Sequence, residues 1–118
     1  FSAEQERMRV QNRADGLHTG FHYAVDGMGV LQILPLNCVS YHAGDGEHGD
    51  GNTKSLSVEI CYSACYGDAE LNYRRSEIVA IELCAWLVRK FDIPEERFRR
   101  HFDWSGKCCP HRIMAEGR

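Results

Sequence analysis

The most reactive stretch of the sequence is HFDWSGKCCPH, residues 101–111. It holds seven side chains that bind metals, carry protons or act as nucleophiles: His101, Asp103, Ser105, Lys107, Cys108, Cys109 and His111. If a strand ends at His101 and a glycine turn folds the chain back, His101 and Cys109 converge on one point. Imidazole and thiolate are a natural ligand pair for Zn²⁺. The alternative is that His101 only caps a strand and Cys109 is a packed thiol.

A second anomaly is Glu59, in the middle of the aliphatic strand pattern SLSVEICYS, residues 55–63. Alternation along a strand places Glu59 with Ser57 and Cys61, opposite the aliphatic side chains. On the floor of a cleft such a carboxylate can act as a general base with a raised pKa. The alternative is a solvent-facing glutamate on a half-exposed strand. Lys107 likewise has two interpretations. It could stabilise an oxyanion beside a metal, or it could be a solvent-exposed lysine in a turn.

The polar segment 40–54 contains four glycines and two histidines, which indicates a functional loop. His42 lies at the loop entry, where its side chain can point into a groove, whereas His48 has the setting of a loop tip. His22 falls within a strand pattern and is expected to be a hydrogen-bonded core histidine. The glycines lack the order of a phosphate-binding P-loop, so phosphate cradling is not expected.

Composition narrows the class of protein. The chain has 118 residues, 14 Lys and Arg against 17 Asp and Glu, and 43% hydrophobic residues, as expected of one globular domain, 1–118. No apolar run is long enough for membrane insertion, and the polar N-terminus does not resemble a signal peptide. Net acidity argues against nucleic-acid binding, and the basic group Arg97, Arg99 and Arg100 is expected to form a solvated edge.

The six cysteines are expected to be reduced thiols of a protein made in a cytoplasm. Cys61 and Cys84 lie in apolar stretches where a thiol packs as a small core residue. Cys108 and Cys109 are adjacent, which is poor geometry for a mutual disulfide. We therefore expect no disulfide framework and at least one cysteine free to act as a ligand.

The elements that must position these residues alternate between helix and strand. The predicted order is a helix at 2–14, two strands at 21–25 and 30–34 joined by an Asp-Gly turn, a strand within 55–63, a helix at 72–91, a short strand reaching about 101, and a helix from about 110. This order predicts an α/β domain with a mixed central β-sheet flanked by helices.

Several segments together resemble one family. The segments are GFHYAVDGMGVLQILPLN, YHAGDG, GNTKSLSVEIC and HFDWSGKCCPHRI. They are similar to the zinc-dependent N-acetylmuramoyl-L-alanine amidases of phage endolysins and bacterial autolysins, which are related to peptidoglycan recognition proteins. The resemblance runs from about residue 2 to 118 in the family's order, and its most specific part is H-x-D-W-S-G-K-x-C-P.

The resemblance implies a zinc site of two histidines and one cysteine, with a fourth position open to water or substrate. His101 would be the second histidine ligand and Cys109 the cysteine. The family's first histidine ligand lies on a strand that would precede Phe1, so this ligand is expected upstream. The chain also stops at 114–118, where the family continues its last helix. We therefore expect an amidase-like fold without its first strand and the end of its last helix.

The resemblance also implies roles in catalysis and substrate binding. Glu59 would be the acid/base carboxylate, and Lys107 would stabilise the tetrahedral intermediate. His42 would line the substrate groove, together with Phe21 and Asn52. The implied reaction is hydrolysis of the amide between N-acetylmuramic acid and the L-alanine of the peptidoglycan stem peptide.

Other functions remain open from the sequence. A non-catalytic peptidoglycan-binding module, or an inactive fragment that lacks one zinc ligand, is the first alternative. A cysteine hydrolase with Cys61 or Cys109 as nucleophile is the second. The resemblance further implies an enzyme made in the bacterial cytoplasm that acts at the cell wall after release, with a separate cell-wall-binding domain in the parent protein.

Overall fold

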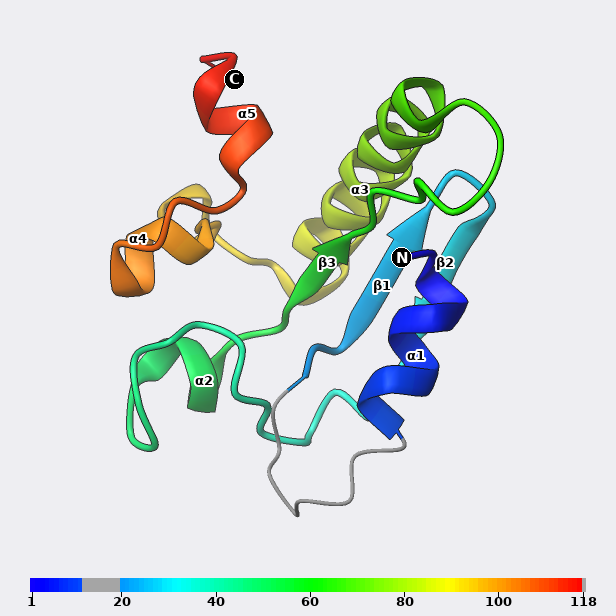
Figure 1. Ribbon diagram of the computed structural model, residues 1–118. Coiled ribbons are helices and arrows are strands. Elements are labelled where there is room, and N and C mark those ends of the chain that lie inside the picture. The colour runs from blue at the N-terminus through cyan, green and yellow to red at the C-terminus, as the bar shows by residue number, and fades with distance from the viewer. Residues whose placement is uncertain (12–19, 118) are drawn as a thin grey trace.

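The computed structural model describes residues 1–11 and 20–117 and is built around a three-stranded sheet (Figure 1). The strands are β1 (Tyr23–Asp26), β2 (Gly29–Gln32) and β3 (Val58–Ile60), in the order β2-β1-β3. β1 pairs antiparallel with β2 through the expected tight turn and parallel with β3. The prediction of a mixed sheet flanked by helices is therefore confirmed.

The two faces of the sheet are covered by α1 (Ala3–Gln11) and α3 (Ala69–Phe91). Alternation along β1 decides which side chains meet which helix. Ala24 packs in a cluster with Ala3 and Val10 of α1, whereas the side chains on either side of it pack in a second cluster with α3. β1 is buried along its whole length because both of its faces are covered.

The long helix agrees with its prediction, apart from a start at Ala69. Asp68 caps this start, since its side chain accepts the N–H of Leu71 at 3.1 Å. The first helix of the prediction is α1; its last positions, 12–14, and the turn after it lie outside the described residues. None of the helices in the described part of the chain has the length and apolar character that a membrane span needs.

The strand predicted to end at about His101 is wrong. Residues 95–97 form the 3-10 helix η1 (Glu95–Arg97), and His101 begins the short helix α4 (His101–Ser105). The cause is a capping box, in which the Asp103 carboxylate accepts the backbone N–H of Arg100 at 2.7 Å. Gly106 ends α4 with a φ of 78°, which glycine adopts without strain.

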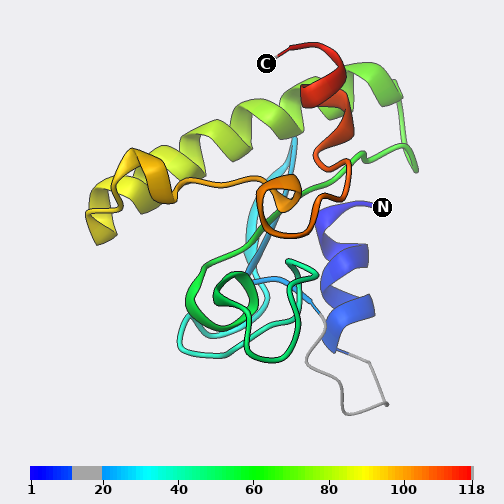
Figure 2. The same cartoon turned by 90° about the vertical axis from the view of Figure 1, so that its left-hand side faces the viewer.

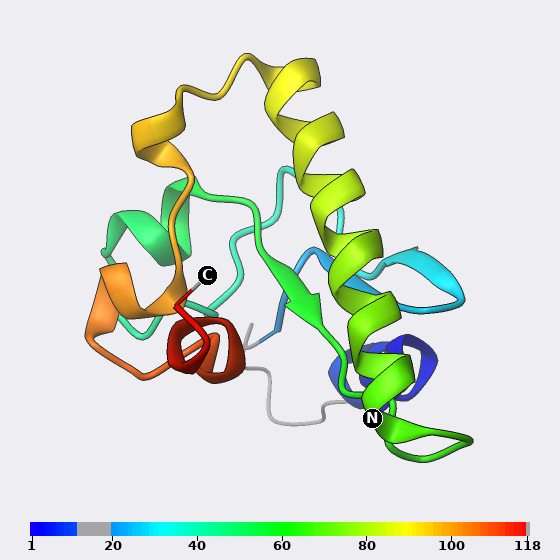
Figure 3. The same ribbon diagram turned by 90° about the horizontal axis from the view of Figure 1, so that it is seen from above.

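Two further short helices complete the fold. α2 (Asp50–Lys54) occupies the end of the segment predicted as a loop, and α5 (His111–Ala115) follows Pro110 as expected. Figures 2 and 3 show α2, α4 and α5 gathered on the β3 side of the sheet, away from β2. Segments from distant parts of the sequence therefore meet beside Glu59.

Candidate active site

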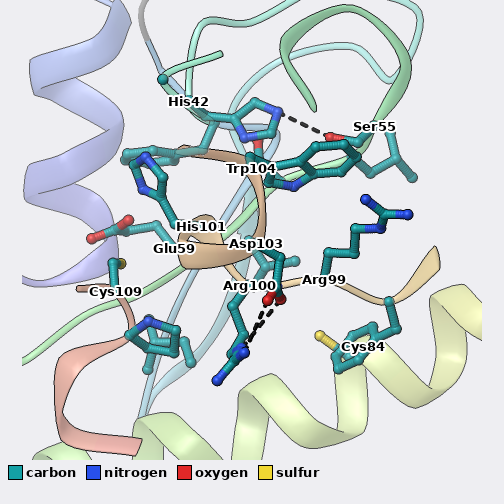
Figure 4. A pocket seen from close by; sticks show the side chains of 18 of the residues that line it. His42, Ser55, Glu59, Cys84, Arg99, Arg100, His101, Asp103, Trp104 and Cys109 are labelled. Carbon is teal, nitrogen blue, oxygen red and sulfur yellow. Dashed lines mark hydrogen bonds and ion pairs between the residues drawn. The ribbon is translucent and has the colours of Figure 1, made fainter. Parts of the chain in front are cut away.

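A cleft of about 1650 Å³ lies beside β3, between the loop that leads to α2 and the segment from η1 to α5. Its lining includes every site residue predicted from the sequence: Phe21, His42, Asn52, Glu59, His101, Lys107 and Cys109. Figure 4 shows His101, Glu59 and Cys109 on one side of this cleft, with His42 and Trp104 above and beside them. The fold thus brings together residues from four separate stretches of sequence.

Glu59 projects from β3 on the face predicted by alternation. Its neighbours Val58 and Ile60 pack in the cluster of α3, whereas Cys61 packs in the cluster of α1. Burial raises the pKa of Glu59, and the nearby Glu6 carboxylate adds to this, against the lowering effect of Arg9 and Lys107. The cleft therefore holds a carboxylate that binds a proton more readily than an exposed one.

The chain folds back around Gly106 between His101 and Cys109, and both residues line the cleft. The N–H of Phe102 donates to the carbonyl of Cys109 at 3.1 Å and closes this loop. Burial raises the pKa of the Cys109 thiol, and the negative charge of Glu59 adds to this. Burial lowers the pKa of His101, and the positive charge of Lys107 adds to that effect. The positive charge of Lys107 therefore acts on the pKa values of Glu59, His101 and Cys109 alike.

His42 is held in a neutral form by its surroundings. Burial lowers its pKa to about 4, and the adjacent His22 and His101 rings contribute to the same shift. Its Nε2 atom lies 3.2 Å from the hydroxyl of Ser55, and that hydroxyl donates to the carbonyl of Gly51. Nε2 is therefore the protonated nitrogen, and Nδ1 is left as an acceptor.

This shift predicts that the metal-free protein loses stability in acid. The unfolded chain takes up a proton on His42 near pH 6.5, whereas the folded chain resists it to about pH 4. The free energy of unfolding should therefore fall by about 2–3 kcal/mol from this group as the pH drops from 7 to 4. Urea unfolding at pH 7 and pH 4 measures this fall in the free energy of unfolding. The fall should be smaller in His42→Gln than in the wild type. His48→Gln, at an exposed position of the same loop, should retain the wild-type slope.

Comparison with known proteins decides the family. Residues 2–112 match the family described as N-acetylmuramoyl-L-alanine amidase. The chain belongs to this amidase family. It is 45% identical over 116 residues to the amidase CwlA of a Bacillus species, covering 98% of this chain and 44% of the relative. It is 50% identical over 100 residues to XlyB of Bacillus subtilis, covering 85% of this chain and 31% of that relative.

Solved structures agree with this membership in the amidase family. The structure of PlyL superposes with a TM-score of 0.86 at 40% identity and covers 100% of this chain and 70% of that one. The PlyG catalytic domain superposes with a TM-score of 0.84 at 41% identity, covering 100% of this chain and 68% of that one. This amidase-family chain spans less than half the length of the curated relatives it matches.

Two of the cleft residues carry donor atoms of the kind that metals bind. His101 and Cys109 offer the nitrogen and sulfur donors that zinc prefers. No group of three His, Cys, Asp or Glu side chains in the described part of the chain has the arrangement of a cation site. His22 is not available as the third donor, because its ring nitrogens contact the Ser57 hydroxyl and the Cys38 carbonyl at 3.1 and 2.8 Å.

A cysteine-hydrolase mechanism, with Cys61 or Cys109 as the nucleophile, is disfavoured in this amidase-family fold. Burial raises the pKa of Cys61 to about 12, and the charge of Glu59 adds to this. A nucleophilic cysteine needs the opposite shift, toward the thiolate. Cys109 is shifted in the same unfavourable direction. All six cysteines are unpaired thiols.

Asn52 lines the cleft, but its side-chain amide is used inside the loop. Its Oδ1 atom accepts the backbone N–H groups of His42 and Ala43, both at 2.8 Å, and its Nδ2 donates to the Gly46 carbonyl at 3.0 Å. Asn52 therefore fixes the backbone from which His42 projects. A direct contact between Asn52 and substrate stays a prediction.

Sequence reasoning predicted Phe21 in the cleft but missed two other aromatic residues that line it, Tyr62 and Trp104. Tyr62 stacks on Tyr73 with ring centroids 5.0 Å apart and contacts His111 through its hydroxyl. Trp104 lies against α2, where a Cβ added to Gly51 would meet the Trp104 ring at 2.8 Å. The only signal for Trp104 was its place inside the reactive motif, and Tyr62 had none, because its partners are distant in sequence.

Proposed function

We propose that this chain is the catalytic domain of a zinc-dependent peptidoglycan hydrolase. The bond cleaved would be the amide between the lactyl group of N-acetylmuramic acid and the L-alanine of the stem peptide. The observation that carries this proposal is the convergence of Glu59, Lys107, His101 and Cys109 in one open cleft, in a chain of the amidase family. These are the groups needed for proton transfer, oxyanion stabilisation and metal binding.

His101 and Cys109 would hold Zn²⁺ together with one further histidine ligand. When bound, zinc supplies Lewis-acid activation of water and of the scissile carbonyl. The thiol of Cys109 must lose its proton to bind, so the positive charge of Lys107 favours the bound form by opposing the effects that raise the thiol's pKa.

Glu59 would act as the general base and then as the general acid. Its carboxylate accepts a proton from the attacking water and passes it to the nitrogen of the departing L-alanine. The raised pKa suits both steps, because a stronger base takes the first proton more readily and still releases it to an amine.

Lys107 and the loop residues would hold the substrate. The ammonium group of Lys107 stabilises the negative oxygen that develops when water adds to the carbonyl. His42 and Phe21 line the groove, and Asn52 keeps the His42 backbone in place.

A non-catalytic peptidoglycan-binding module is the rival function, and a chelator distinguishes the two. We expect release of stem peptides from muramic acid to stop on treatment with a chelator and to return when Zn²⁺ is added. A binding module would release no peptide under either condition. A cysteine hydrolase would keep its activity in the chelator and lose it to a thiol-alkylating reagent.

We also propose where the enzyme acts, which is at the bacterial cell wall. The curated relatives are more than twice as long as the matched segment, which supports a separate cell-wall-binding domain in the parent protein. Synthesis in the bacterial cytoplasm, followed by release to the cell wall, is the localisation we propose. The polymer substrate would be peptidoglycan in either a phage-derived or a host enzyme.

A further inference from the structure

The candidate cleft is basic, although the chain as a whole is acidic. Acidic residues outnumber Lys and Arg by 17 to 14 over the sequence. The cleft lining reverses this balance, with seven basic residues, Arg9, Lys54, Arg97, Arg99, Arg100, Lys107 and Arg112, against the three acidic residues Glu47, Glu59 and Asp103. A concave surface lined by one sign of charge focuses its field on ligands of the opposite sign. Four of the seven are paired with carboxylates, Arg9 with Glu6, Lys54 with Asp50, Arg100 with Asp103 and Arg112 with Glu70. Among the described residues this leaves Arg97, Arg99 and Lys107 as the basic side chains that can receive an anion in the cleft.

Arg99 is the basic residue that is best fixed for binding one. Its Nε donates to the carbonyl of Glu96 at 3.3 Å, and its guanidinium carbon lies 4.9 Å from the centroid of the Trp104 ring. Trp104 is itself held by its close approach to Gly51 of α2. A guanidinium that lies over an aromatic ring can still offer its outer N–H edge to a planar, two-oxygen partner. Figure 4 shows Arg99 and Trp104 side by side in the cleft.

Arg100, the neighbouring arginine, is already paired with a carboxylate. Arg100 is engaged by Asp103, with two side-chain contacts at 2.9 and 3.2 Å. Among the ion pairs found in the described residues, none joins Arg99 to a carboxylate within 4 Å, although Asp103 is near enough to feel its charge. Arg100 is thus largely neutralised, whereas Arg99 remains exposed to the cleft.

We propose that Arg99, which lies over the Trp104 ring, binds a free carboxylate on the peptide arm of the substrate. This inference rests on the proposed function. In the amide to be cleaved, the carboxyl group of muramic acid is already consumed, so the negative charges of a muramoyl peptide lie on its peptide side. A guanidinium held in a plane binds such a carboxylate through two parallel hydrogen bonds. The Arg99 end of the cleft therefore takes the peptide.

The test compares two ligands and three proteins by calorimetric titration. The ligands are an N-acetylmuramoyl tripeptide with free carboxylates and the same molecule with these groups converted to carboxamides. The proteins are the wild type, Arg99→Gln and Arg89→Gln, an equal loss of charge at an exposed α3 position outside the cleft. Wild type and Arg89→Gln should bind the carboxylate ligand about three- to tenfold more tightly than the carboxamide, and Arg99→Gln should bind both alike.

Arg99→Lys separates charge from geometry. Lysine keeps the positive charge without the stacked, planar fork, so the preference for carboxylate should persist in a weaker form. Equal affinity of the wild type for both ligands, or an undiminished preference in Arg99→Gln, would overturn the carboxylate site while leaving peptide binding by the cleft intact. Failure of the wild type to bind either ligand would instead overturn the proposed function, and this inference with it.

Discussion

Replacing Glu59 with glutamine is expected to lower kcat by about 10²–10⁴-fold, because the enzyme loses the group that moves the proton from water to the leaving amine. Glutamine keeps the size of the side chain and removes its ability to accept a proton. Zinc should remain bound, since Glu59 is not one of the proposed ligands. The measurement is the rate of muramoyl-peptide hydrolysis by the zinc-loaded enzyme, paired with elemental analysis of the same sample.

Glu82→Gln is the matched control for this substitution. Glu82 is an exposed glutamate on α3 that does not line the cleft, so its loss should leave both rate and zinc content unchanged. The role assigned to Glu59 is wrong if Glu59→Gln retains nearly the wild-type rate. It is also wrong if the variant loses zinc in proportion to activity, because Glu59 would then act by holding the metal.

Replacing Cys109 with serine should lower activity by a comparable factor, but through loss of the metal and not of the general base. A serine hydroxyl is a far weaker zinc ligand than a thiolate, so affinity for the metal should fall by at least about 100-fold and activity with it. Bound zinc after dialysis is the quantity to measure, and it should drop from one ion per active wild-type molecule to a small fraction.

The adjacent thiol provides an unusually close control. Cys108 is exposed and does not line the cleft, so Cys108→Ser should keep both zinc and activity. If the two serine variants retain zinc equally, Cys109 is not a ligand. If Cys108→Ser loses zinc and Cys109→Ser does not, the wrong cysteine has been assigned.

The sequence predicted which residues meet better than it predicted the elements that bring them together. His101 and Cys109 were expected to converge through a strand and a glycine turn; both line the same cleft, but the chain between them runs through the helix α4. The fold-back depends on Gly106, which either element would use. The helix depends on the capping contact between Arg100 and Asp103, a local interaction that competes with strand propensity. Strand alternation placed Glu59 correctly because it depends on geometry alone.

Contacts between segments that lie far apart along the chain could not be predicted from the sequence pattern. Arg99 is exposed, as expected of a solvated edge, but nothing in its neighbours along the chain reveals that it also lines a cleft with His42 and Glu59. Asn52 looked like a substrate contact, and its two bonds to the His42 segment became visible only in the folded loop. Tyr62 was overlooked because its stacking partner lies on another element. Each depends on tertiary placement that no local pattern encodes.

The cleft is proposed to hydrolyse one particular amide. The new end groups formed when purified peptidoglycan is digested test this proposal most directly. After digestion by the zinc-loaded enzyme, we predict new free amino groups on L-alanine and new free carboxyl groups on muramic acid, with no new reducing sugar ends. New reducing ends, or new amino termini on any other residue of the peptide, would contradict the account.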